Sequence, residues 1–201
     1  IKLGDHVQAK ASILFSDIRG FTSLVEGMNP VEAIRFINTY LSKMEPAVVA
    51  GGGFVDSYVG DAVMAVFDRG ADAAVSAGIE MLRSLGEWQR MREAGGVPLI
   101  RIGVGIATGD MIFGTIGSAN RLKCGVIGDT VNLAARIETL TKRYGLGLLI
   151  AGRTRKALAD PARYLIREVD LVTVAGREAP VRLHEVFDAD PPHLRDQKLA
   201  T

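Results

Sequence analysis

Two aspartates lie where strand-like segments end, and their chemistry suits a divalent cation. Asp17 closes the apolar run of residues 10 to 18, and Asp61 follows Gly60 between two further apolar segments. Gly-Asp between such segments is typical of a two-residue β-hairpin turn, because glycine supplies the positive φ that these turns require. If the strands are neighbours, both carboxylates lie at one edge of one sheet. Carboxylate oxygens favour Mg²⁺ or Mn²⁺, whose other ligands are commonly water and phosphate oxygens.

Each aspartate taken alone has a simpler explanation. An Asp at a strand end or hairpin tip commonly accepts hydrogen bonds from nearby backbone N–H groups and so stabilises a turn. The metal-site hypothesis therefore needs support from elsewhere in the chain.

That support comes from residues 129 to 143, which carry the clearest helix pattern. A capping Asp or Thr precedes the pattern, basic residues occupy its last turn and Gly145 follows, as helix ends prefer. Asn132 and Arg136 are four residues apart and therefore share one face, which could bind a phosphate or remain a solvated surface. The apolar stripe beside them consists of Val131, Leu133, Ala134, Ile137 and Leu140.

Four segments, in this order along the chain, resemble the successive blocks of a class III nucleotidyl cyclase catalytic domain. They are ILFSDIRGFTSLVE, FVDSYVGDAVMAVF, RIGVGIATGDMIFGTIGS and VIGDTVNLAARIE, and the resemblance covers about Gly4 to Phe187. The resemblance implies an enzyme in which the ribose 3′-hydroxyl of a nucleoside triphosphate attacks the α-phosphate. The expected products are a cyclic 3′,5′-nucleotide and pyrophosphate, with ATP and cyclic AMP favoured and GTP the alternative.

The resemblance also implies roles for individual residues. Asp17, Asp61 and the backbone carbonyl of Ile18 match the ligands of two metal ions, Mg²⁺ or Mn²⁺. Asn132 matches the residue that positions the ribose, and Arg136 matches the residue that stabilises charge on the reacting phosphate. Two metals suit this chemistry, because one activates the attacking hydroxyl while the other neutralises the leaving group.

Three positions depart from the family pattern. Adenylyl cyclases of the family carry Lys where this chain has Ser57, and Asp or Thr where it has Gly125. Guanylyl cyclases carry Glu and Cys there, although Cys124 lies one position away. Loss of a base-reading hydrogen bond weakens discrimination between bases. For the Lys that binds the triphosphate, the nearest candidate is Arg177.

The resemblance further implies partners. We expect a head-to-tail homodimer in which Asp17 and Asp61 come from one subunit and Asn132 and Arg136 from the other, and a sensor or membrane domain upstream in the full-length protein. Two alternatives remain open. One is a catalytically weak or inactive regulatory module that keeps the fold and the dimer, and the other is a palm-type enzyme such as a diguanylate cyclase, which does not account for the VNLAAR helix.

Composition narrows the class of protein without identifying it. The 201 residues have a formal net charge of +1 and a single cysteine. Such a charge balance provides no basic field for nucleic acid, and one cysteine forms no intrachain disulfide. Without an apolar run of about 20 residues, we expect a cytoplasmic protein or the cytoplasmic domain of a membrane-attached one.

We expect one catalytic domain over residues 1 to 190 and a frayed C-terminal tail over residues 191 to 201.

The elements that must position these residues alternate between strands and helices. Hairpins dominate, which predicts an α+β fold with a ferredoxin-like βαββαβ core, a largely antiparallel sheet flanked by helices and a C-terminal β extension. The expected order is a strand at 10 to 17, a helix at 30 to 49, a hairpin at 54 to 67, a helix at 70 to 94, a strand hairpin at 99 to 116 and the helix at 129 to 143, followed by a strand, a short helix and a closing β pair.

Overall fold

A computed structural model describes residues 5–92, 99–118, 121–174 and 179–200, and its centre is one mixed β-sheet. The strand order is β2-β3-β1-β4-β6-β8-β7, with β5 paired to β4 outside this path. All the pairs are antiparallel except the parallel pair β4–β6. The strands are β1 (His6–Ile18), β2 (Phe54–Val59), β3 (Ala62–Phe67), β4 (Ile102–Ser118), β5 (Arg121–Ile127), β6 (Leu148–Ala151), β7 (Ile166–Val172) and β8 (Val181–Val186).

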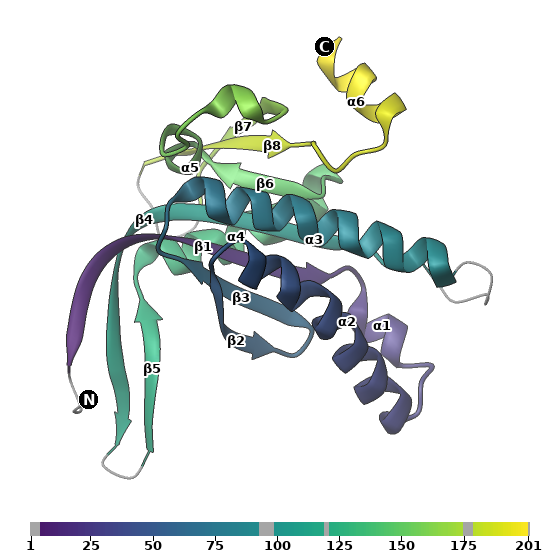
Figure 1. The fold of residues 1–201 in the computed structure, drawn as a ribbon, viewed down its shortest axis with the longest axis horizontal. Coiled ribbons are helices and arrows are strands. Elements are labelled where there is room, and N and C mark those ends of the chain that lie inside the picture. Colours follow the sequence, from purple (N-terminus) through teal and green to yellow (C-terminus); the bar gives the residue numbers. More distant parts are fainter. Residues whose placement is uncertain (1–4, 93–98, 119–120, 175–178, 201) are drawn as a thin grey trace.

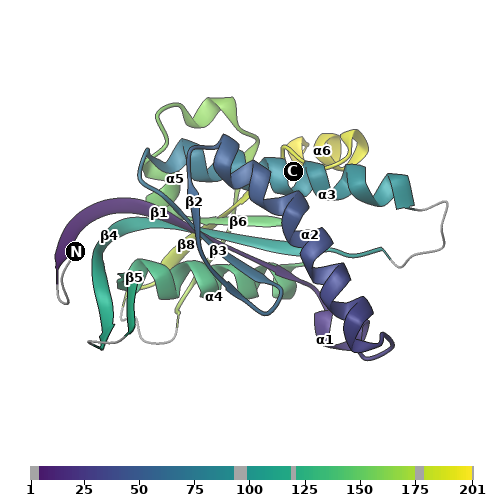
Figure 2. The same cartoon turned by 60° about the horizontal axis from the view of Figure 1, so that its bottom comes forward.

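Helices cover both faces of the sheet (Figures 1 and 2). The α2 and α3 helices pack on one face, where Tyr40 and Met81 are fully buried, and α4 packs on the other, where Leu133 and Ile137 are buried. This arrangement confirms the predicted α+β fold. The helices are α1 (Phe21–Val25), α2 (Pro30–Ala50), α3 (Ala71–Arg92), α4 (Asp129–Tyr144), α5 (Gly152–Lys156) and α6 (Pro192–Leu199), with a 3₁₀ turn at Pro161–Arg163.

Local sequence signals explain where the long helices begin and end. The Asn29 side chain accepts a hydrogen bond from the Glu32 N–H at 3.0 Å, and the Glu32 carboxylate accepts one from the Asn29 N–H at 3.1 Å. These two bonds form a capping box at the start of α2. At the end of α4, Gly145 adopts φ +69°, a left-handed conformation that favours glycine.

The glycines of β4 allow α4 to lie directly on the sheet. A Cβ atom added to Gly105 would lie 2.1 Å from the Glu138 backbone nitrogen, and one added to Gly103 would lie 2.2 Å from the Thr141 hydroxyl. A side chain at either position would therefore push the helix away. This close packing fixes α4 relative to β1, which pairs with β4 along its whole length.

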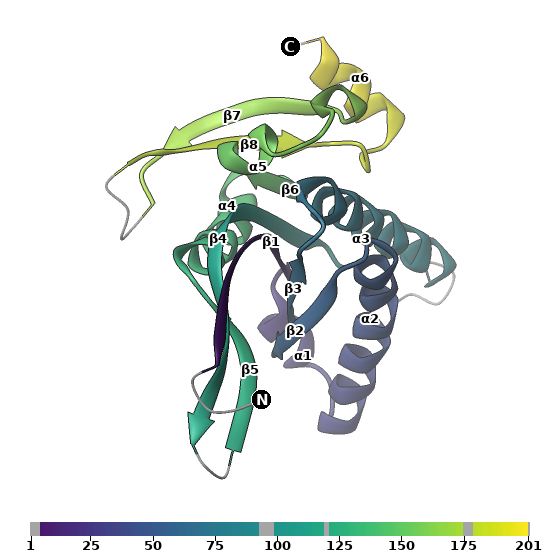
Figure 3. The ribbon, with the colours of Figure 1, turned by 60° about the vertical axis from the view of Figure 1, so that its left-hand side comes forward.

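Two sequence-based expectations about local structure are wrong. Residues 102 to 118 form one continuous strand instead of a hairpin within 99 to 116, because Gly109–Asp110 pairs with β1 and the chain turns later, between β4 and β5 (Figure 3). The chain end is also more ordered than a frayed tail. Residues 192 to 199 form α6, and the Lys198 ammonium forms ion pairs with Glu185 and Asp190. Among the described helices, none is both long and apolar enough to cross a membrane.

Candidate metal and nucleotide site

The fold brings Asp17 and Asp61 together at one end of the sheet. Asp17 is the second-last residue of β1, and Asp61 lies in the turn between β2 and β3, the strand that pairs with β1. Gly60 adopts φ +64° in this turn, as predicted for a hairpin. The Ile18 N–H donates a hydrogen bond to Asp61 Oδ2 at 2.9 Å, which orients a carboxylate that is only 8% exposed.

The electrostatics of this pair show excess negative charge. The pKa of Asp17 is raised from 3.8 to about 7, first by burial, then by a hydrogen bond with Asp61 and by the charges of Asp61 and Glu138. Among the described residues, no Lys or Arg forms a salt bridge with either aspartate. Two carboxylates that share a partly buried site without a salt bridge favour protonation or a metal ion.

Sequence reasoning missed two residues beside the pair, Glu138 and Arg19. Burial raises the pKa of Glu138 to about 6, and the charge of Arg19 opposes that rise. The Arg19 guanidinium donates to the Thr141 hydroxyl at 2.8 Å and to the Leu146 carbonyl at 2.7 Å, so it ties the end of β1 to the end of α4. A signal for this proximity was present in the Gly103-x-Gly105 spacing, which allows the helix to approach.

The donor set fits a hard divalent cation. The described residues contain no group of three or more His, Cys, Asp or Glu side chains placed to hold a metal. Protein ligands at this site would therefore be the carboxylates of Asp17 and Asp61 and the adjacent carbonyl of Ile18. Mg²⁺ is commonly bound in this way, by one or two carboxylates together with water and substrate phosphates.

Asn132 and Arg136 lie on α4, away from the carboxylates. The buried residues Leu133, Ala134 and Ile137 face the sheet, whereas Asn132 is exposed and Arg136 is half-buried. Within the described chain, neither residue forms a hydrogen bond or ion pair with Asp17 or Asp61. Nine residues separate Asn132 from Thr141, the contact of Arg19, which is about 14 Å along the helix axis. Asn132 thus lies well away, along α4, from the end of the helix that Arg19 ties to β1.

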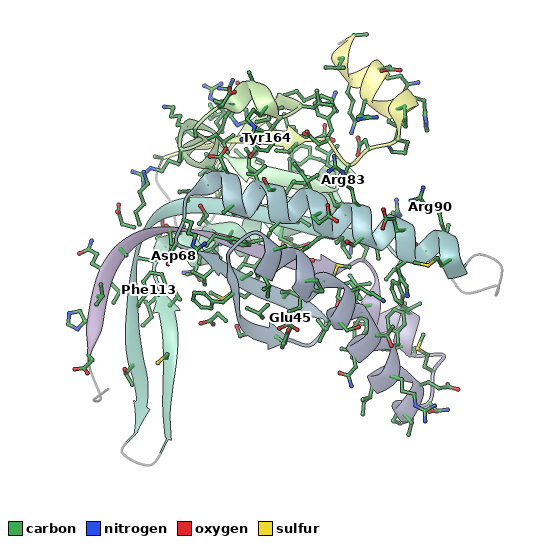
Figure 4. All side chains as sticks on the ribbon, viewed as in Figure 1. Glu45, Asp68, Arg83, Arg90, Phe113 and Tyr164 are labelled. Atoms are coloured by element: carbon green, nitrogen blue, oxygen red, sulfur yellow. The ribbon has the colours of Figure 1, made fainter. Side chains whose placement is uncertain are left out.

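The two expected base-reading residues lie in different settings. The Ser57 hydroxyl donates to Met64 Sδ at 3.7 Å, whereas Gly125 lines an apolar groove of about 270 Å³ between β2 and the β4–β5 hairpin. Phe113, labelled in Figure 4, forms part of this groove. Asp56 lines the groove in place of Ser57, because the register of β2 against β3 shifts between Val55 and Ser57. The sequence carries no signal for such a bulge. Arg177 lies outside the described residues.

Residues 5–185 match the family model for the adenylate and guanylate cyclase catalytic domain. The chain belongs to this cyclase family. It is 42% identical to an adenylate cyclase of Anabaena cylindrica over 92% of its length, and it spans 38% of that relative. The adenylyl cyclase CyaB from P. aeruginosa superposes with a TM-score of 0.82 at 31% identity, covering 92% of this chain and 96% of that one. The guanylyl cyclase Cya2 superposes with a TM-score of 0.79 at 34% identity, covering 96% and 98%.

Membership of the cyclase family settles two of the sequence-based questions. It confirms the resemblance drawn from the four segments, and it excludes the diguanylate-cyclase alternative as the family assignment. Cyclases of this family generally use divalent metal ions, which agrees with the oxygen donors found at Asp17 and Asp61. Solved structures with adenylyl and guanylyl activity in their names both resemble this chain, so the fold alone does not select the base.

Proposed function

We propose that this chain is an adenylyl cyclase catalytic domain that converts ATP into cyclic AMP and pyrophosphate. The observation that carries the proposal is the carboxylate pair of Asp17 and Asp61 at the end of β1, which forms no salt bridge among the described residues. It occurs in a chain that is 42% identical to a curated adenylate cyclase. Negative charge gathered at one point is suited to holding the metal ions of a nucleoside triphosphate.

In the proposed reaction, each residue has a distinct task. Asp17 and Asp61, with the Ile18 carbonyl, would hold two Mg²⁺ or Mn²⁺ ions. When bound, these metals lower the pKa of the ribose 3′-hydroxyl and neutralise the triphosphate. Asn132 orients the ribose through its amide so that the hydroxyl faces the α-phosphate. Arg136 donates to the phosphate oxygens, where negative charge develops as the bond to pyrophosphate breaks.

We propose that the working site is shared between two copies of the chain. The support is geometric, because α4 carries Asn132 and Arg136 on its side away from the sheet, apart from the carboxylates of the same chain. A head-to-tail dimer would bring the metal ligands of one subunit to the donors of the other, forming two equivalent sites. A sensor or membrane domain upstream in the full-length protein remains part of the proposal.

A second candidate function is a regulatory module that keeps the cyclase fold but turns over slowly. The observation that favours it is the base-reading region. The Ser57 hydroxyl is engaged by Met64 and Gly125 has no side chain to offer, so a bound base has fewer specific partners than in other family members.

An assay of the purified chain separates the two candidates. It would use ATP or GTP with Mg²⁺ or Mn²⁺ and measure cyclic nucleotide directly. We expect cyclic AMP from ATP, with Mn²⁺ the better metal, because a loosely held base leaves substrate geometry more dependent on the ion. The control is the Asp17→Ala, Asp61→Ala double variant. Product no greater than with this control would support the regulatory module.

A further inference from the structure

A cavity of about 720 Å³ lies where β6 leads into α5 and β8 begins. Basic side chains dominate its described lining: Arg153, Arg155 and Lys156 come from α5, and Arg182 comes from β8. The carboxylate in this lining is Glu168 of β7, which forms an ion pair with Arg182. Four cationic groups therefore surround one carboxylate, and the described wall has an excess of positive charge.

His184 lies in the wall of this cavity, close to its basic side chains. The residue lines the cavity and is only 4% exposed, and its Nδ1 atom is buried without a hydrogen-bond partner among the described residues. Burial lowers the pKa of His184, as do the charges of Arg155 and Arg182, while Glu168 opposes them. His184 therefore lies within electrostatic reach of two guanidinium groups of the cavity wall, Arg155 and Arg182.

The apolar part of the lining limits what the ligand can be. Leu133 of α4 and Val181 of β8 form one wall, next to Pro180. The volume falls within the range of about 300 to 1,000 Å³ that is typical of sites for organic ligands, and it exceeds what a single inorganic anion would fill. Paired guanidinium groups match the geometry of a phosphate group, which accepts two parallel hydrogen bonds from each.

We propose that this cavity binds a small organic phosphate, with its phosphate group between Arg155 and Arg182 and its apolar body against Leu133 and Val181. The proposed reaction assigns no ligand to Arg155 or Arg182.

The cavity is separate from the carboxylate pair of the same chain. His184 pairs with Ile150 of β6, which pairs with Ile106 of β4, whereas Asp17 of β1 pairs with Gly103 of β4. Three strand spacings thus separate the two residues across the sheet, which is about 14 Å. The β4 register adds three residues along the strand, about 10 Å more. In the proposed dimer, the nucleotide would instead meet Asn132 and Arg136 of this chain, and Leu133 of the cavity wall follows Asn132 on α4. The experiment must therefore distinguish the cavity from the nucleotide site.

Calorimetric titration with phenyl phosphate and with inorganic phosphate tests the assignment. We expect one phenyl phosphate per chain, bound more tightly than inorganic phosphate because the ring contacts the apolar wall. Arg155→Gln and Arg182→Gln should each weaken binding by about tenfold or more, because each removes a charge-assisted hydrogen bond. Both side chains are exposed, so these variants should fold. The matched control is Arg35→Gln, an exposed position on α2, which should bind like the unchanged chain.

A second readout identifies where the ligand sits. The imidazole pKa of His184, followed by NMR, should rise when phenyl phosphate binds, since the anion offsets the charges of Arg155 and Arg182. Three results would overturn the proposal: no binding at millimolar probe, equal affinity for both probes, or binding that is lost in Arg136→Ala and kept in Arg155→Gln. The last result would assign the probe to the nucleotide site.

Discussion

Two buried carboxylates at different places in the sheet have opposite surroundings. Glu185 of β8 is 1% exposed and forms ion pairs with Arg167 and Lys198. Asp61 is 8% exposed, and its described partners are a backbone N–H and the carboxyl group of Asp17. A buried charge that is paired within the chain holds segments together, whereas one placed beside a like charge needs a cation from outside. The contrast separates a structural cluster from a functional one.

The largest expected effect follows from neutralising one carboxylate in each cluster. Asp17→Asn or Asp61→Asn should lower kcat/KM for cyclic nucleotide formation by about a thousandfold, because metal ligation and charge stabilisation are lost together. Glu185→Gln should change kcat/KM by less than about threefold, since that site contacts no substrate in the proposed reaction. Steady-state assays with Mn²⁺ and ATP measure both. Equal losses of kcat/KM in the Asp17/Asp61 and Glu185 variants would mean that the two clusters do not differ in function.

The second prediction concerns whether Asp17 of one chain and Arg136 of another serve one active site. Arg136→Ala alone should reduce kcat by about a hundred- to a thousandfold, as removal of a donor to a developing charge commonly does. Mixing inactive Asp17→Ala chains with inactive Arg136→Ala chains should restore about a quarter of wild-type activity. Random mixing makes half the dimers mixed, and each mixed dimer has one intact site of its two.

Subunit exchange must be shown independently, for example by a fluorescence signal between labelled chains. If exchange is complete and the mixture stays inactive, Asp17 and Arg136 do not serve a shared site across the dimer.

The sequence predicted those parts of the site that depend on local signals. The Gly60–Asp61 turn and the Gly145 end of α4 follow from residue types at short range, and the structure confirms them. The expected N-cap, Asp129 or Thr130, is wrong: Gly128 occupies that position without a side-chain hydrogen bond, because the Thr130 hydroxyl donates to the Asp110 carbonyl of β4. Glu138 and Arg19 were not placed in advance, because their proximity to Asp17 depends on how closely α4 approaches β4, which the Gly103-x-Gly105 spacing indicates only once the two elements are known to be neighbours. Similarly, the Lys198 contacts that order α6 join residues separated by 8 and 13 positions. Such contacts leave no periodic pattern in the sequence.

The third prediction concerns stability and uses the balanced cluster. Glu185→Ala should lower the free energy of unfolding by about 1 to 3 kcal/mol, because Arg167 and Lys198 lose their shared partner. The cost stays below that of a fully buried pair, since the side chains of Arg167 and Lys198 are 38% and 17% exposed and retain contact with water. The matched control is Glu168→Ala, whose partner Arg182 is half exposed, so its cost should be about 0 to 1 kcal/mol. Urea denaturation measures the free energy of unfolding of both variants. Similar losses in Glu185→Ala and Glu168→Ala would contradict a larger stabilising role for Glu185.

The smallest expected effect is the pH dependence of the unbalanced cluster in metal-free protein. The pKa of Asp17 is about 7 in the folded chain and 3.8 without the fold. Between these values the folded chain binds a proton that the unfolded chain has released, so stability should fall as pH rises from about 4 to 7. Glu138, with a folded pKa of about 6 against 4.5, contributes in the same direction. Both carboxylates are partly exposed, so solvent screening leaves only a fraction of the full linkage energy. We expect a decrease of a few degrees in Tm, the scale of about 1 kcal/mol for a chain of this size. Added Mg²⁺ should raise Tm more at pH 8 than at pH 5, because at low pH the metal must displace protons from its ligands. Asp17→Asn should weaken both the fall of stability with pH and the pH dependence of the Mg²⁺ effect, whereas Glu185→Gln should leave both unchanged. A metal response that persists in Asp17→Asn would place the cation elsewhere, and the contrast between the two carboxylate clusters would then fail.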